Sequence, residues 1–232
     1  LNADYTLWMD KSFVRSTQMS NGDYARINLG GVDARHMGIE LDFSLRPTRW
    51  MDITGMLSLG NWIWDSNTKG YIYDSQGQPM TAALDGTVAS GIMADDHAWL
   101  FLKQKGIKVG GSAQTTGAIG VTVRPMKGLR VSADWNAYGN NYADFWLGSG
   151  LNGNQTIEVK DPWRIPWGHQ LDLSASYRFK IGNIFATIYG NVNNVYNYNY
   201  IMDAQSDALQ EGIWQNAVSY THLRAHETGA YL

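Results

Sequence analysis

The fold is decided by one stretch, LDLSASYRFK, which runs from Leu171 to Lys180. Its odd positions are apolar, from Leu171 to Phe179, and its even positions are polar or charged, from Asp172 to Lys180. Successive side chains of a β-strand point to opposite faces, so this period of two predicts a strand with one apolar and one polar face. The stretch also exceeds the length of an ordinary strand, which is about five or six residues.

The same alternation recurs along most of the chain. In the first six alternating stretches no Asp, Glu, Lys or Arg falls on the apolar face. A seventh stretch, which starts at Asn183, is apolar on both faces at first, so its facing stays open. The pattern predicts seven strands, at residues 2–13, 33–46, 51–64, 114–124, 129–143, 168–180 and 184–197.

Short and long links alternate between these strands. The short links should join neighbours as hairpins, which predicts antiparallel strands in chain order with no parallel pairs; they are residues 47–50, 125–128 and 181–183. The long links are rich in Gly, Asn, Asp and Ser and are expected to be loops; they are roughly residues 14–32, 65–113 and 144–167. Residues 94–104 include a candidate short helix within the longest of these loops.

Strand length and link length favour a membrane barrel over a soluble sandwich, which would bury its apolar face. A strand tilted near 40° climbs roughly 2.5 Å per residue, so about ten residues cross the roughly 25 Å apolar band of an outer-membrane barrel. Short turns at one rim and long loops at the other are typical of such barrels. The predicted fold class is therefore all-β: a fragment of a transmembrane antiparallel β-barrel, with about seven long meander strands in an open curved sheet.

In such a sheet the two faces meet different solvents. The apolar side chains should lie on the convex, lipid-facing side and stay exposed; they are Leu41, Phe43, Val121, Val131, Leu171, Leu173 and Phe179. The charged ones should line the concave side; they are Glu40, Asp42, Asp134, Asp172 and Arg178. Trp50 and Trp62 are spaced as two interface girdles would be, yet their parity places them with Asp52 on the polar face, and the sequence leaves this open.

Composition sets limits on the function. Charged residues make up 17% of the 232-residue chain, below the roughly 25% that is typical of soluble proteins. A net charge of −3 argues against a nucleic-acid partner. With no Cys, neither disulfides nor thiolate metal sites are available. The first residues have neither the basic start nor the apolar core of a signal peptide and read as part of a strand, so a fragment is expected.

Three stretches resemble TonB-dependent outer-membrane receptors. KVGGSAQTTGAIGVTVRPMKGLRVSADWNAYGNNYADF (108–145) and LDLSASYRFKIGNIFATIYGNVNNVYNYNYIMDA (171–204) resemble the late barrel strands of that family. ARHMGIELDFSLRPTRWMDITGMLSLGNW (34–62) resembles the strand-turn-strand before them. The run NNVYN (193–197), followed by Tyr200, looks like the family's "N-L-F-N…Y" near its C-terminus.

The resemblance implies part of a 22-stranded barrel in the cell outer membrane, plugged by an N-terminal domain and energised through TonB. Members import scarce ligands such as iron chelates, cobalamin or oligosaccharides. The implied partners are outer-membrane lipid, TonB through an N-terminal region outside this chain, a small-molecule or glycan ligand, and a surface lipoprotein. On this interpretation residues 1–217 are a partial barrel that lacks the plug, the earlier strands and the last strand.

Aromatic side chains in the long links are the candidate ligand contacts, because they could stack on a sugar or a chelate; membrane-interface girdles explain them equally well. They are Trp62, Trp64, Tyr71, Tyr73, Trp146, Trp163 and Trp167.

No catalytic, metal or cofactor residue is predicted. The pair Asp95–Asp96 lies in a loop, and Glu40 and Asp42 share a polar strand face. His97 is expected to be a solvated loop residue. An enzyme is therefore not expected.

The end of the chain, VSYTHLRAHET (218–228), places His222 and His226 four residues apart, as a helical metal site would. It also resembles the translation of an adapter used in transposase-based sequencing libraries, and residue 217 is Ala, one of the four residues that the adapter allows there. Residues 218–232 are therefore expected to be a non-native tail, in helix or coil, that adds no packed strand and binds no metal.

Two alternatives remain. One is another outer-membrane barrel, such as a passive porin, which would need no plug. The other is a soluble β-sandwich that binds carbohydrate through the aromatic residues of its loops.

Overall fold

The computed structural model describes the chain except for residues 83–87, 91–96, 211–213, 221–223 and 227–232; side-chain surroundings are also not described for Ser90 and 214–226. The described residues form β-strands, turns and irregular segments, with no helix among them. The described residues therefore contain no helix that could span a membrane.

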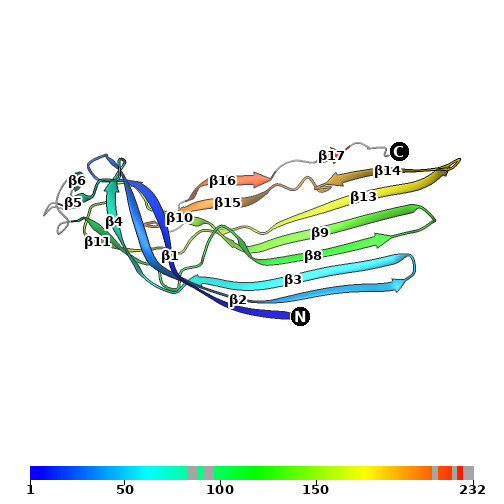
Figure 1. Ribbon diagram of the computed structural model, residues 1–232, viewed down its shortest axis with the longest axis horizontal. Helices are drawn as coiled ribbons and strands as arrows, with labels where there is room; N and C mark the ends of the chain where they lie inside the picture. The colour runs from blue at the N-terminus through cyan, green and yellow to red at the C-terminus, as the bar shows by residue number, and fades with distance from the viewer. Residues whose placement is uncertain (83–87, 91–96, 211–213, 221–223, 227–232) are drawn as a thin grey trace.

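Seven long strands lie side by side in chain order (Figure 1). We call them the long sheet: β1 (Asn2–Gln18), β2 (Tyr24–Thr48), β3 (Met51–Trp64), β8 (Ala113–Val123), β9 (Leu129–Tyr142), β13 (Gly168–Ile181) and β14 (Ile184–Asn193). Every neighbouring pair among them is antiparallel, which confirms the predicted meander. The sheet is open and not closed into a barrel.

The predicted boundaries hold closely for β3, β8, β9 and β13 and less well elsewhere. β1 runs on to Gln18 and β2 begins at Tyr24, so most of the link predicted at 14–32 is strand. β14 ends at Asn193 instead of residue 197, because Asn194 and Asn197 adopt positive φ values of 52° and 49°, which a strand does not tolerate.

The register aligns apolar side chains across the whole sheet. Directly paired residues of antiparallel strands project from the same face. One such row comprises Phe43, Gly55, Ile119, Trp135 and Leu171. A second apolar row lies two residues closer to the short turns; it begins at Leu45 and Ile53 and continues through Val121 and Leu173. Between them runs a row of the opposite face: Ser44, Thr54, Gly120, Asp134 and Asp172.

The two-faced pattern predicted from the sequence is therefore confirmed. The predicted exposure holds for three of the seven apolar residues: Leu41, Phe43 and Leu173 are 44%, 40% and 39% exposed. It does not hold for the other four, which are half-buried: Val121, Val131, Leu171 and Phe179. The predicted charged residues fall on the opposite face. That the apolar face is the convex one stays a prediction.

The long links are loops only in part, which corrects the prediction. They contribute short strands that gather at one end of the long sheet (Figure 1): β4 (Thr68–Asp74), β5 (Met80–Ala82), β6 (Val88–Ser90), β7 (Trp99–Lys103), β10 (Asp144–Trp146), β11 (Gln155–Glu158) and β12 (Arg164–Ile165). We call these strands, with residues 13–34, the head. Trp99–Lys103 is a strand, so the candidate helix at 94–104 is wrong for that part; 94–96 lie outside the described residues.

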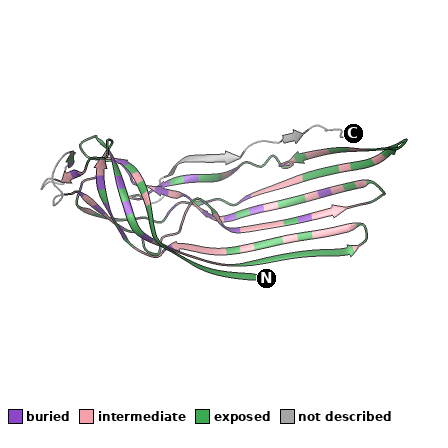
Figure 2. Ribbon diagram, in the orientation of Figure 1, coloured by how far each residue is buried: buried purple, intermediate pink, exposed green. Residues whose placement is uncertain are grey.

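Alternation builds the head as it builds the long sheet. Ile27 of β2 pairs with Ile72 of β4, and Gly70 of β4 pairs with Leu100 of β7. The apolar positions of these strands face inward and form the core of the molecule (Figure 2). Its largest fully buried side chains are Met19, Ile27, Leu29, Ile72, Met80, Leu100, Leu102 and Leu147.

Parallel pairing, which was not expected, occurs outside the long sheet. β11 pairs with β7, and β10 pairs with β15 (Tyr200–Asp207), both in parallel. These contacts join segments that lie more than 50 residues apart in the sequence. The short links could not predict these pairs, because a short link specifies pairing only between strands that are neighbours in the chain.

The end of the chain also departs from prediction. β16 (Trp214–Tyr220) pairs with β15, and β17 (Arg224–His226) pairs with Asn191–Asn193 of β14. The expectation of helix or coil is therefore wrong for 218–220 and 224–226, and β17 adds a short strand to the sheet that was not expected. The expected open edges are found: among the described residues, Ile184–Gly190 of β14 have no partner beyond β13, and β1 pairs only with β2 along the long sheet.

Candidate functional site

The seven aromatic candidates do not form one site. The structure places one on the polar face of the long sheet, one in the head core, two on the outer face of the head and three around β10 to β13; in that order they are Trp62, Trp64, Tyr71, Tyr73, Trp146, Trp163 and Trp167.

Trp62 lies on the polar face. It pairs with His36, and their rings stack with centroids 5.0 Å apart. Trp8 meets the other side of His36 at 6.3 Å, edge to face. The register from Ala34 to Leu45 has no shift, so no bulge rotates Trp62 toward the apolar face. For Trp62 this answers the question that parity left open; for Trp50, which precedes β3, it stays open.

Trp64 is a structural residue. It is 8% exposed and belongs to the head core, with its ring 5.7 Å from that of Phe13. Its buried Nε1 has no hydrogen-bond partner among the described residues. A ligand cannot reach this ring, so Trp64 is removed from the candidates.

Tyr71 and Tyr73 belong to a cluster of rings on the outer face of the head. His97 contacts both, at centroid distances of 5.0 and 4.7 Å, and its Nε2 lies 2.9 Å from the carbonyl oxygen of Ile72. Lys69 Nζ lies 4.7 Å from the ring centroid of Trp99, which pairs with Tyr71. Trp99 was not among the predicted ligand contacts, because residues 94–104 were expected to include a short helix, whereas Trp99 begins β7.

Trp146 and Trp163 are half-buried. Trp163 packs against the small apolar cluster of Ala143, Ile165 and Ala204, and its backbone N–H donates to Ser206 Oγ at 2.7 Å. Neither ring offers a broad open face of the kind that Tyr71 does.

Trp167 stands on the apolar face near the head. It is 51% exposed and covers Gly139, which leaves no room for a side chain. His169 is next on that face, stacked on Tyr198 at 4.4 Å and 6.3 Å from the ring of Trp135. Together these residues form a band of rings at the head end of the apolar face.

A turn after β14 positions one further ring, that of Tyr200, which was not among the predicted ligand contacts. Asn194 is fully buried; its Oδ1 accepts from Tyr198 N–H and its Nδ2 donates to the Tyr198 carbonyl, both at 3.1 Å. Its own N–H donates to Asp172 Oδ1 at 2.8 Å. The chain then places the ring of Tyr200 over Gly168, where any side chain would clash.

A cavity of about 280 Å³ opens beside Tyr200, between β8, β9, β13 and β15. The rings of Tyr138 and Tyr200 stack at 6.0 Å along it. Asn141, which is 7% exposed, donates from Nδ2 to the Met202 carbonyl at 2.8 Å, and its buried Oδ1 has no partner among the described residues. Such a cavity offers ring surface and one free acceptor. This cavity could not be predicted, because β15, which forms one side of it, was not predicted.

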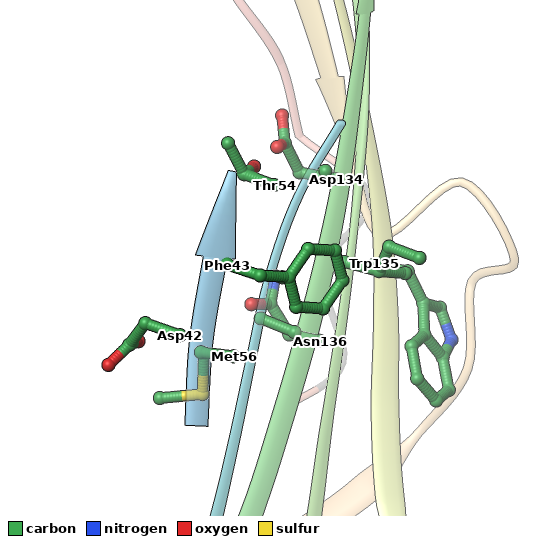
Figure 3. Close-up of a pocket in the computed structure, with 11 residues that line it drawn as sticks. Asp42, Phe43, Thr54, Met56, Asp134, Trp135 and Asn136 are labelled. Atoms are coloured by element: carbon green, nitrogen blue, oxygen red, sulfur yellow. The ribbon is translucent and has the colours of Figure 1, made fainter. Parts of the chain in front are cut away.

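The middle of the long sheet separates its chemistry by face. Figure 3 shows Phe43 and Trp135 projecting to one side of the sheet and Asp42 and Met56 to the other. A hollow of about 300 Å³ lies around this region, where Gly55 and Gly120 carry no side chains. Glu40 and Asp42 are exposed on the polar face, so they are solvated carboxylates of a wall.

No metal site is found where the structure can be described: no three His, Asp or Glu residues gather there as ligands. Asp95, Asp96 and His222 lie outside the described residues, and the side chain of His226 is not described.

Comparison of the chain with protein-family models, with curated proteins and with solved structures found no match.

Proposed function

We propose that the chain is part of a TonB-dependent transporter of the bacterial outer membrane, which imports a scarce ligand such as an iron chelate, cobalamin or an oligosaccharide. The observation that carries the proposal is the continuous apolar face of the long sheet. Its side chains are aligned by register across all seven strands and remain exposed.

Water is a poor solvent for such a face. Burying apolar surface gains roughly 25 cal/mol per Å², and monomeric soluble proteins rarely expose apolar patches beyond a few hundred Å². Here one face exposes, among others, Ile39, Leu41, Phe43, Leu45, Leu57, Leu59, Ile119, Leu173, Tyr177, Ile188 and Val192. No second sheet covers them among the described residues. Acyl chains would cover them, whereas a soluble sandwich would need a facing sheet.

The band of rings orients the sheet in the proposed membrane. Aromatic side chains concentrate at the membrane–water interface of outer-membrane barrels. Trp135, Trp167, His169 and Tyr198 lie on the apolar face at the head end. Because the short turns of such barrels face the periplasm, the head would stand outside the cell.

The two open edges fit a wall that continues on both sides. β1 and most of β14 leave a row of backbone groups free along the long sheet. Unpaired backbone groups are costly in lipid, and only closure of the sheet removes them. Further strands of the same protein would therefore complete the barrel.

The polar face and the head would then meet the ligand. The cluster around Tyr71, Tyr73 and Trp99 offers ring faces beside the Lys69 ammonium, and the Tyr138–Tyr200 cavity offers rings and a free amide oxygen. Both suit a glycan or a chelate held by stacking. TonB, through an N-terminal region, and a surface lipoprotein are the proposed partners.

A passive porin would present the same wall, so the decisive experiment uses the intact gene. Outer-membrane fractionation and heat-modifiable migration on gels should show a folded barrel. Growth on limiting iron chelate, cobalamin or oligosaccharide should depend on the gene and stop when TonB is deleted. Growth that survives TonB deletion would favour the porin, and a protein that stays soluble without detergent would reject both.

A further inference from the structure

The short-turn end of the long sheet carries a concentration of positive charge. A cavity of about 480 Å³ around the β8–β9 turn is lined by Met126, Gly128 and Leu129 together with four cations: Arg124, Lys127, Arg130 and Arg178. No carboxylate lines it. We call this cavity the arginine bowl.

The carboxylate of Asp52, beside the bowl, is already engaged. Asp52 Oδ1 accepts from Arg46 Nε at 2.6 Å, and its Oδ2 accepts from Arg124 Nη1 at 2.5 Å. Arg130 and Arg178 have no ion pair with a carboxylate among the described residues. Within the described part of the chain, neither guanidinium is therefore neutralised by an ion pair.

The bowl is also held in shape. The Arg178 backbone N–H donates to the Gly128 carbonyl at 2.8 Å, which ties the β8–β9 turn to β13. Gly128 has a φ of 87°, which a residue with a Cβ rarely adopts. The guanidinium of Arg178 lies 4.5 Å from the ring centroid of Phe185, so a ring supports its flat face. A stacked guanidinium keeps its N–H edge free for a ligand.

Hydroxyl groups continue the site along the polar face. A second hollow, of about 390 Å³, shares Arg130 with the bowl and is lined by Ser132, Ser174 and Ser176, with the carboxylate of Asp134 at the end away from the bowl's turn. Guanidinium forks recognise the oxygens of a phosphate in bidentate fashion, and hydroxyls can donate to the same group. A carboxylate has only two oxygens and cannot occupy three arginines equally well.

We propose that the arginine bowl binds the phosphate group of a phosphate ester. Arg124, Arg130 and Arg178 hold its oxygens, and the serine hollow takes the polar remainder. The ester is either a soluble metabolite or the headgroup of an anionic lipid. The inference does not depend on the proposed transport function, because it uses only the polar face and the turn.

The test uses the chain refolded in a phosphate-free detergent such as an amine oxide. Glycerol 3-phosphate is titrated calorimetrically, and phosphatidylglycerol mixed into the micelles is followed by its phosphorus resonance. One or both should bind, and the R130Q/R178Q double variant should weaken binding at least about tenfold. The control variant, Arg26→Gln, removes an exposed arginine of the head and should change nothing.

The outcomes distinguish a soluble phosphate ester from a lipid headgroup, and specific phosphate binding from binding by charge alone. Binding of glycerol 3-phosphate identifies a soluble ester, and binding of phosphatidylglycerol alone identifies a lipid headgroup. The R130K/R178K variant keeps the charge and loses the forks, so it should bind several-fold more weakly than the native chain. Equal binding by that variant, equal competition by acetate, or no binding of either phosphate would overturn the proposal.

Discussion

The head and the long sheet share one sequence pattern but differ in what their apolar faces contact. In both, apolar residues alternate with polar ones along each strand. In the head, short strands fold over one another and Ile27, Ile72 and Leu100 are fully buried. In the long sheet Leu41, Phe43 and Leu45 point away from the protein and are 40–56% exposed.

The difference shows that alternation specifies a strand with two faces and leaves open what covers the apolar one. In the head other strands of the protein cover the apolar faces, so this region should be stable in water. The long sheet has no cover of its own in the described chain, so its stability should depend on the surroundings. Substitutions in the two regions should therefore respond differently to the solvent.

The largest effect is expected in the head core. Leu100→Ala removes a fully buried side chain and should lower the free energy of unfolding by about 2–5 kcal/mol, through lost burial and a cavity. Urea unfolding of the refolded protein in detergent, followed by tryptophan fluorescence, measures it. The matched change on the apolar face, Leu41→Ala, should cost far less in the same micelles, and equal losses would erase the distinction between the regions.

A charge on the apolar face should matter only in a bilayer. Phe43→Arg should destabilise the protein folded into lipid vesicles by about 2–4 kcal/mol, which is the cost of an arginine near the midplane of a barrel wall. Ser44→Arg, one residue further and on the polar face, is the control and should change it little. If the two variants fold into vesicles equally well, the apolar face does not meet lipid.

The turn after β14 should give a smaller, solvent-independent effect. Asn194→Ala removes two side-chain hydrogen bonds with Tyr198 at a buried position and should cost about 1–3 kcal/mol. Asn194→Gly tolerates the φ of 52°, so it should cost about 1 kcal/mol less than the alanine variant. The comparison is made by urea unfolding, and a neutral alanine variant would show that the turn does not depend on this side chain.

The smallest effect concerns an exposed ion pair of the head. Lys103 Nζ donates to Glu158 Oε1 at 3.0 Å, and this hydrogen bond lowers the pKa of Glu158 from its ordinary value. A lowered folded-state pKa means that the stabilisation is present above the unfolded-state pKa and is lost as pH falls through the folded-state pKa. Urea midpoints measured on either side of that window should fall slightly less in Glu158→Gln than in the native chain. An identical fall would show that the pair contributes nothing.

The long sheet could be predicted from the sequence because each strand carries its own signal. Leu171–Lys180 alternates without interruption, and the two-residue turn at Gly182, with a φ of 60°, admits only a hairpin. Neighbour pairing then followed from chain order. Such local signals fix the strands and the faces of β3, β8, β9 and β13.

The head could not be predicted in the same way. Ala98, Leu100 and Leu102 alternate, but over five residues only, and the neighbouring Gly and Asp residues are typical of a loop. The parallel pair β7–β11 joins residues about 55 positions apart, which no local pattern specifies. The same holds for the candidate site: Trp62 was placed by parity, whereas the Tyr138–Tyr200 cavity depends on β15, whose position is fixed by the buried Asn194 turn.

The most direct test of the account asks what each face of the long sheet meets. The chain contains no Cys, so single spin labels can be placed without background substitutions. Phe43→Cys and Leu173→Cys label the apolar face, and Asp42→Cys and Ser174→Cys label the polar face one residue away. In lipid vesicles the account predicts that labels at 43 and 173 collide with dissolved oxygen and not with a water-soluble nickel chelate, whereas labels at 42 and 174 collide with the chelate. Equal chelate accessibility at all four positions, or a label at 43 shielded from both reagents, would contradict it.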